Sequence, residues 1–345
     1  MDLQNKTNKL KQEKKYKQYI KEKKLKMSQE NNLNEEEYLR KHLEDLERSK
    51  QNNNIRMPED PIFNQVKSDN TRTADLHYLS FDVKEFPAGI FYPAGTTIQV
   101  RAAQTSEIQA YSMVDDNNFY DIIEKMNDML ASCVRIKYPD GKISSYLDLR
   151  DPDRYYLIFL IRELTFQKGN VLATKATCSC GEETQIELKR ENFIKYEIDE
   201  NIKEYFNNAY NCFTFELTNG EVFNLAPPKI GLQKSFTDFI IKENAEKKKP
   251  NLSFLKIVPF TLYDRNSITI EGIKSKLSDF TNPNKMDDVS FQFLNSAVGK
   301  LTFGIKQLKK ECGHCGLEVR SDMVFPNGPS AIFVIHDAFE KFIKK

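Results

Sequence analysis

Hydrophobic and polar positions divide the chain into a polar N-terminal part and a globular remainder. Residues 1–55 contain few apolar side chains, and Leu39, Leu43 and Leu46 form a single short stripe at helical spacing. This surface is too small to support independent folding. We therefore predict a charged helical arm over 1–55, followed by a polar linker over 56–80.

From residue 81 onward, the pattern predicts helices and short hairpins. Apolar residues recur at helical spacing over 118–132. The segment DPDRYYLIFLIRELTF (151–166) indicates a buried helix with Asp151 as N-cap and Pro152 at its first position. Alternating β-formers predict three hairpins, whose segments are VLATKAT with TQIEL, CFTFELTNGEVFNL, and TFGIK with LEVRSDMVFP.

Three further helical patterns lie near 235–247, 253–263 and 286–300, and the final AIFVIHDAFEKFIKK reads as a strand running into a short helix. The fold class predicted is α+β, with mixed helices and short antiparallel hairpins. We divide it into a core domain over 81–230 and a second part over 231–345. The second part holds a helical insertion and the C-terminal segment, and each part carries one pair of cysteines.

Charge and hydropathy restrict the class of protein. Lys and Arg number 51 against 50 Asp and Glu, so no global field indicates nucleic acid or a membrane as partner. The lysines gather locally within the arm, where a partner protein is the favoured contact. The longest apolar run, YYLIFLI, is too short to span a bilayer, and no signal peptide opens the chain. We expect a soluble protein made in a reducing cytosol.

Four of the six cysteines form two close pairs, each followed by a glycine. Cys178 and Cys180 lie in TCSCG, and Cys312 and Cys315 lie in ECGHCGLEV, each between two strand-like runs. Two tight turns that face each other can hold one zinc ion in a tetrahedral four-thiolate site, although the first pair is CxC rather than the usual CxxC. We predict a zinc-ribbon-like site in which zinc is structural, because four thiolates leave no coordination position open.

The long segment between the pairs, residues 181–311, does not argue against a shared site. Closing a loop of this length costs roughly 4–5 kcal/mol of chain entropy. A structural zinc site contributes an apparent ~10–16 kcal/mol at neutral pH, which exceeds that cost.

Other interpretations of the cysteines remain open. CGHC is also the motif of a thiol–disulfide exchanger, but such a motif opens a helix, and the residues after Cys315 alternate like a strand. Unmetallated structural cysteines are a further alternative. His314 could replace one thiolate, but it lies between two cysteines and is expected to face solvent. Cys133 and Cys212 are predicted to be small buried hydrophobic residues.

Motifs of common active sites are missing from the chain. It contains no phosphate loop, Rossmann glycine pattern, HExxH or nucleophile elbow. The carboxylates form no clear constellation, and the four histidines are His42, His77, His314 and His336. We therefore predict that the protein is not an enzyme.

Several short motifs occur along the globular part of the chain: PAGIFYP followed by IQVRAA, MLASCVRI, LIFLIRELTF leading into TCSCG, and the late CGHCGLEV and FPNG-x-x-AIF. In this order they resemble the baseplate hub proteins of contractile-tailed bacteriophages of the T-even type. The lysine-rich arm and the long segment between the cysteine pairs depart from the family pattern. Cys178, Cys180, Cys312 and Cys315 are the residues that transfer, as zinc ligands.

The resemblance implies a structural component of a phage tail baseplate hub, assembled in the host cytoplasm and located in the virion. Its partners would be other baseplate and tail proteins in a hetero-oligomeric assembly, and the 1–55 arm is one candidate contact. An assembly factor absent from the mature virion is an alternative. A zinc-ribbon protein that binds nucleic acid through its lysines is another. Nucleic acid is disfavoured because Glu182 and Glu183 follow one cysteine pair, although Lys309 and Lys310 precede the other.

Overall fold

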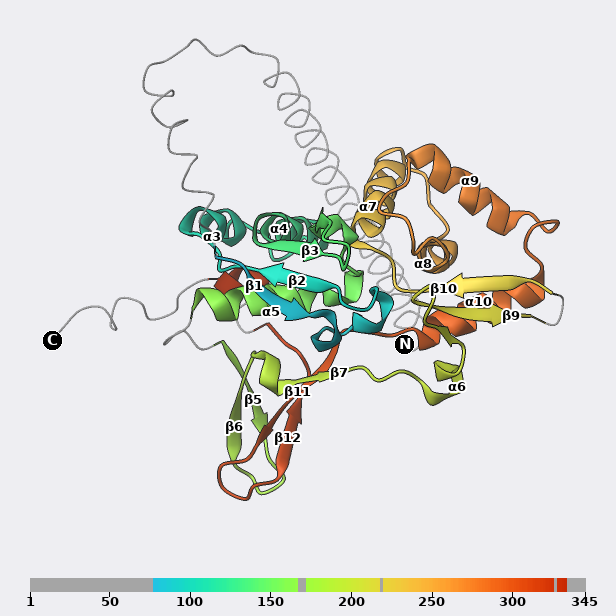
Figure 1. The fold of residues 1–345 in the computed structure, drawn as a ribbon. Coiled ribbons are helices and arrows are strands. Elements are labelled where there is room, and N and C mark those ends of the chain that lie inside the picture. The colour runs from blue at the N-terminus through green and yellow to red at the C-terminus, as the bar shows by residue number, and fades with distance from the viewer. Residues whose placement is uncertain (1–76, 167–171, 218–219, 326–327, 334–345) are drawn as a thin grey trace, which may run out of the picture. The chain divides into compact units, whose positions relative to one another are not determined.

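The computed structural model describes one compact unit of the chain, and its described residues are 77–166, 172–217, 220–325 and 328–333. The predicted arm over 1–55 and the linker up to residue 76 lie outside these residues. The described part contains eight α-helices and four small antiparallel sheets, which confirms the α+β class (Figure 1). None of its helices has both the length and the apolar character that a membrane span requires.

The sheets have the strand orders β1-β2-β3-β4, β10-β9-β8, β12-β11-β7 and β5-β6. The strands are β1 (Leu79–Asp82), β2 (Thr97–Val100), β3 (Val134–Lys137), β4 (Ile143–Ser145), β5 (Ala173–Thr177), β6 (Glu183–Glu187), β7 (Phe193–Lys195), β8 (Phe206–Asn207), β9 (Cys212–Glu216), β10 (Val222–Leu225), β11 (Ile305–Glu311) and β12 (Glu318–Ser321). The three predicted hairpins are confirmed as β5–β6, β9–β10 and β11–β12.

The helices are α3 (Thr105–Ser112), α4 (Phe119–Cys133), α5 (Arg154–Thr165), α6 (Glu200–Lys203), α7 (Ile230–Ala245), α8 (Leu252–Thr261), α9 (Ile270–Thr281) and α10 (Asp288–Lys300). The Asn118 side chain caps α4 by accepting from the backbone N–H groups of Tyr120 and Asp121, and this helix matches the prediction. Helices α3, α6 and α9 were not predicted. Its strand at 331–333 is wrong, because Pro329–Phe333 forms a 3₁₀ helix.

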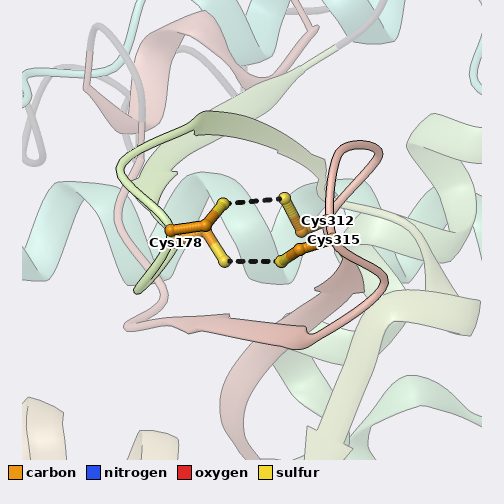
Figure 2. Close-up of side chains that lie close together, drawn as sticks. Cys178, Cys312 and Cys315 are labelled. Carbon is orange, nitrogen blue, oxygen red and sulfur yellow. Dashed lines mark hydrogen bonds between the residues drawn. The ribbon is translucent and has the colours of Figure 1, made fainter.

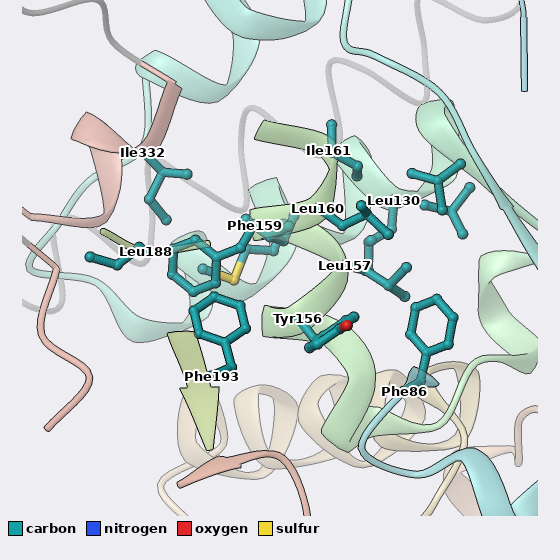
Figure 3. Packing of buried hydrophobic residues seen from close by; sticks show 14 of the residues in the cluster. Phe86, Leu130, Tyr156, Leu157, Phe159, Leu160, Ile161, Leu188, Phe193 and Ile332 are labelled. Atoms are coloured by element: carbon teal, nitrogen blue, oxygen red, sulfur yellow. The ribbon is translucent and has the colours of Figure 1, made fainter. Parts of the chain in front are cut away.

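The centre of the largest hydrophobic core is α5. Leu157, Phe159, Leu160 and Ile161 are at most 1% exposed and pack among residues from the first sheet, α4 and the cysteine-bearing hairpins (Figure 3). Burying each such side chain stabilises the fold by roughly 1.5–3 kcal/mol. The buried helix was therefore predicted correctly, and it connects the first sheet to the base of both hairpins.

The start of this helix differs from the prediction. Asp151–Asp153 forms a separate 3₁₀ turn, and α5 begins at Arg154. Asp151 is therefore not the N-cap of α5. The Asp–Pro sequence does begin a helical turn, but the turn is a 3₁₀ turn and its cap position is occupied by Arg150.

Two smaller hydrophobic clusters lie in the region between the cysteine pairs. One contains Phe213 and Leu225 of the β9–β10 hairpin together with Leu294 of α10. The other contains Phe236 of α7 and Val258 of α8, with α7, α8 and α9 packed against one another. The residues between the two cysteine pairs thus supply most of two further apolar clusters, and the first of these also includes Ala88 and Phe91 from before the first pair.

Arg150 and Asp153 form a buried polar connection between the core regions. The Arg150 guanidinium donates to the main-chain oxygens of Phe91, Pro227 and Tyr263, at 3.1, 3.0 and 2.8 Å from its nitrogens. The Asp153 carboxylate accepts from the Ala88 N–H and from the Tyr92 hydroxyl. The same hydroxyl accepts from the Arg150 N–H. Residues 88–92, which precede β2, are therefore fixed to the 3₁₀ turn at the start of α5.

Removal from water raises the pKa of Asp153 to about 6, and its hydrogen bonds from Tyr92 and Ala88 offset only part of this effect. The unfolded value is about 3.9. The folded chain therefore keeps a proton on Asp153 over a pH range in which the unfolded chain has lost it. The stability contributed by this proton is complete below about pH 4 and is lost as the pH rises through about 6.

The change Asp153→Asn tests this pH dependence. Between pH 4 and pH 7, the natural chain should lose up to about 3 kcal/mol of its free energy of unfolding through Asp153, and the variant should not. The free energy of unfolding of the variant minus that of the natural chain should therefore rise by this amount. Urea denaturation at intervals of pH measures the difference. Asp140→Asn, in an exposed turn, is the control. A constant difference between Asp153→Asn and the natural chain across this range would contradict the assignment.

Candidate metal centre

The first cysteine pair lies in the turn between β5 and β6. The Cys178 N–H donates to the Glu182 oxygen at 2.8 Å, and the Gly181 N–H donates to the Cys178 oxygen at 2.9 Å. Gly181 has a φ of 90°, in the left-handed region that a residue without Cβ adopts at little cost. The turn therefore brings Cys178 and Cys180 close together at the tip of the hairpin.

The second pair lies in the turn between β11 and β12 and has the same construction. The Cys312 N–H donates to the Leu317 oxygen, and the Gly316 N–H donates to the Cys312 oxygen, both at 2.9 Å. Gly316 has a φ of 73°. A glycine in the left-handed region therefore follows each pair of cysteines, although the two turns contain different numbers of residues.

The two turns face each other and bring all four thiols together. The Sγ atoms of Cys178 and Cys315 are 3.5 Å apart, and those of Cys180 and Cys312 are 3.8 Å apart. All four Sγ atoms lie within 4.8 Å of one another. Figure 2 shows the thiols of the two turns pointing toward one another.

This spacing fits one tetrahedral metal ion such as zinc. With Zn–S bonds of about 2.3 Å, a regular tetrahedron places its sulfur atoms about 3.8 Å apart. The sulfur-to-sulfur distances across the two turns are close to this value. Since the four ligands come from two hairpins far apart in the sequence, a bound ion would connect the two hairpins at their tips.

The environment of Cys312 favours its thiolate, which is the form that binds metals. Backbone N–H groups of Cys315 and His314 lower the pKa of Cys312 to about 6. For Cys315, the Leu317 N–H also favours the thiolate, but the neighbouring thiols outweigh it and raise the pKa to about 12. Four adjacent thiols cannot all ionise without a compensating positive charge, and a divalent cation supplies that charge.

The cluster is partly covered by the protein. Cys178 and Cys312 are 5% and 2% exposed, whereas Cys180 and Cys315 lie at the surface. Inside the hairpins, the buried Ile186, Leu308 and Val319 continue the largest core toward the cluster. The buried Thr184 was not predicted as part of the site; its hydroxyl contacts Cys312 and favours the thiolate. Its inward position on β6, two residues after Glu182, is the signal that could have identified it.

The other residues considered from the sequence contribute no side chain to the group of four cysteines. Cys133 and Cys212 are fully buried, and burial raises the pKa of Cys133 to about 12, as expected for unreactive core thiols. His314 is exposed and does not belong to the group of metal-ligating side chains, which agrees with the prediction. His77 is also exposed, whereas His42 and His336 fall outside the described residues.

No family model, curated protein or solved structure matches this chain.

Proposed function

We propose that the protein is a non-enzymatic structural component of the baseplate hub of a contractile-tailed phage, and that a structural zinc ion joins its two cysteine-bearing hairpins. The single structural observation that supports the proposal is the closed group of four cysteines, which carries its zinc-joined part. Four thiolates complete the tetrahedral coordination of zinc, so the ion would have no position for water or substrate.

The position of the cluster in the chain supports a structural role for the ion. It joins the two ends of a segment that supplies most residues of two smaller hydrophobic clusters. A metal at this point limits the movement of that segment relative to α5, because both hairpins share the core built around α5. A rigid arrangement of surfaces is what a subunit needs in order to contact several neighbours in a large assembly.

The assignment to a baseplate hub rests on the motifs that resemble the hub family. Several of these motifs form buried hydrogen bonds, the central helix or a cysteine turn in this fold. PAGIFYP contains Phe91 and Tyr92, which bond to Arg150 and Asp153. LIFLIRELTF forms most of α5, and TCSCG forms the first cysteine turn. The resemblance therefore involves residues on which the fold depends.

Mass spectrometry of purified virions and isolated tails of the phage that encodes the chain tests the assignment. We expect the chain in tails, at a fixed ratio to other baseplate proteins, and we expect no complete baseplates when its gene is interrupted. Absence from virions combined with failed tail assembly would favour an assembly factor instead. Normal, infectious tails without the protein would contradict both roles.

A further inference from the structure

Each cysteine-bearing hairpin leaves one strand edge without a partner strand. β6 pairs only with β5. β11 pairs with β12 on one side, but β7 covers its other side only as far as Leu308. Within the described part of the chain, no strand pairs with these edges near the cysteines. Such edges present backbone N–H and C=O groups to which an extended segment of another chain can add.

Hydrogen bonds fix which residues face the open edge of β6. Because the Glu182 oxygen accepts from Cys178 in the first hairpin, it points toward β5. The direction of the backbone groups alternates along an antiparallel strand, so those of Glu183 and Gln185 point away from β5. In agreement, the Gln185 oxygen accepts from the Lys310 Nζ atom at 2.9 Å, across the gap between the hairpins.

The same reasoning applies to β11. The Cys312 N–H bonds to the Leu317 oxygen and therefore faces β12. The backbone groups of Lys309 and Glu311 consequently point to the other side, beyond the end of the pairing with β7. Open edges of both hairpins thus approach each other just below the cysteine turns.

An open groove of about 470 Å³ lies along these edges and extends to the second cysteine turn. Its charged lining residues are Glu182, Glu183, Lys310 and Glu311. Glu183 forms an ion pair with Lys175 at 2.6 Å, and Lys310 is bonded to Gln185. Among the described residues, Glu182 and Glu311 have no ion-pair partner. The groove therefore combines free strand edges with an excess of negative charge.

We propose that this groove binds an extended, lysine- or arginine-rich segment of a partner protein, which adds as a strand to the edge of β6. Backbone hydrogen bonds to Glu183 and to the Gln185 N–H would hold the segment, while the Gln185 oxygen keeps its bond from Lys310. The basic side chains of the segment would pair with Glu182 and Glu311. The glutamates repel nucleic acid phosphates, so the groove suits a polypeptide. This proposal rests on the proposed function, because the metal holds the two hairpins in place.

The test uses the full chain with its metal and a fluorescein-labelled peptide of alternating lysine and threonine, followed by fluorescence anisotropy. We expect binding that weakens as salt is added. The double change Glu182→Lys and Glu311→Lys should weaken it by about tenfold or more. The matched control, Glu124→Lys with Glu204→Lys, makes the same change in charge at exposed positions outside the groove and should leave binding unchanged.

A second variant tests the backbone contribution. Gln185→Pro removes the N–H that points away from β5, so it leaves the β5–β6 hydrogen bonds in place and should still weaken peptide binding. A peptide of alternating glutamate and threonine is the sequence control. Equal binding of the acidic peptide, or binding that the groove variants do not change, would overturn the proposal.

Zinc content measured in the same samples separates this proposal from the proposed function. A groove variant that keeps its zinc and loses the peptide would support the groove. A natural chain that holds zinc but does not bind the basic peptide would overturn the groove alone. A chain that holds no zinc would overturn the metal-joined arrangement on which both proposals depend.

Discussion

The change Cys312→Ser is expected to abolish metal binding and to release the tips of both cysteine-bearing hairpins. Zinc content should fall from one ion per chain to near zero, because a serine hydroxyl does not replace a thiolate at neutral pH. Amide hydrogen exchange at 178–183 and 312–317 should accelerate by about a hundredfold or more, since structural zinc contributes many kcal/mol to the local fold. Helix α4 should keep its protection.

Two controls make this result specific. Cys133→Ala and Cys212→Ala also remove a thiol, but both residues are buried away from the cluster, so zinc content should stay at one ion per chain. Cys178→Ser should reproduce the effect of Cys312→Ser from the other hairpin. Full zinc content in either ligand variant, or equal zinc loss in the Cys133 and Cys212 variants, would contradict the four-cysteine centre.

The second large effect is expected from Arg150→Met, which removes a buried guanidinium but keeps an apolar side chain that matches the aliphatic part of arginine. The oxygens of Phe91, Pro227 and Tyr263 would lose their donor inside the protein. A buried polar group without a partner costs about 1–3 kcal/mol, so the free energy of unfolding should fall by roughly 3–5 kcal/mol.

Urea denaturation followed by circular dichroism measures this loss. Arg135→Met is the matched control, because Arg135 bonds to the Gln99 side chain and stacks on Tyr78 at a partly exposed position of the first sheet, where water can replace its contacts. We expect a loss of no more than about 1 kcal/mol there. A similar, small loss for both variants would show that Arg150 does not connect the core regions.

Local sequence signals predicted the elements whose determinants lie within them. Helix α4 has a clear apolar stripe and Asn118 as its cap, and the cysteine turns carry their glycines beside the thiols. Helix α9 was missed even though the Thr269 side chain caps it. Ile270, Ile273, Leu277 and Phe280 recur at helical spacing in α9 and pack in the cluster shared with α7 and α8, so the apolar pattern was present in the sequence and was overlooked.

Contacts between distant residues could not be derived from the sequence. The position of Asp153 at the start of a helical segment suggests a local role, yet its carboxylate bonds to Ala88 and Tyr92, more than sixty positions earlier. The same holds for the pairing across the cysteine turns. Spacing and glycines predicted two turns that face each other, but the proximity of Cys178 to Cys315 and of Cys180 to Cys312 depends on the packing of both hairpins onto the core.

Native mass spectrometry of the purified full chain, before and after treatment with a chelator, tests the central claim most directly. The account predicts one zinc ion per chain before treatment, and a chelated form in which Cys178, Cys180, Cys312 and Cys315 become reactive toward a thiol-alkylating reagent. A chain that carries no metal when prepared under reducing conditions with zinc present, and whose four thiols react equally with and without chelator, would contradict it.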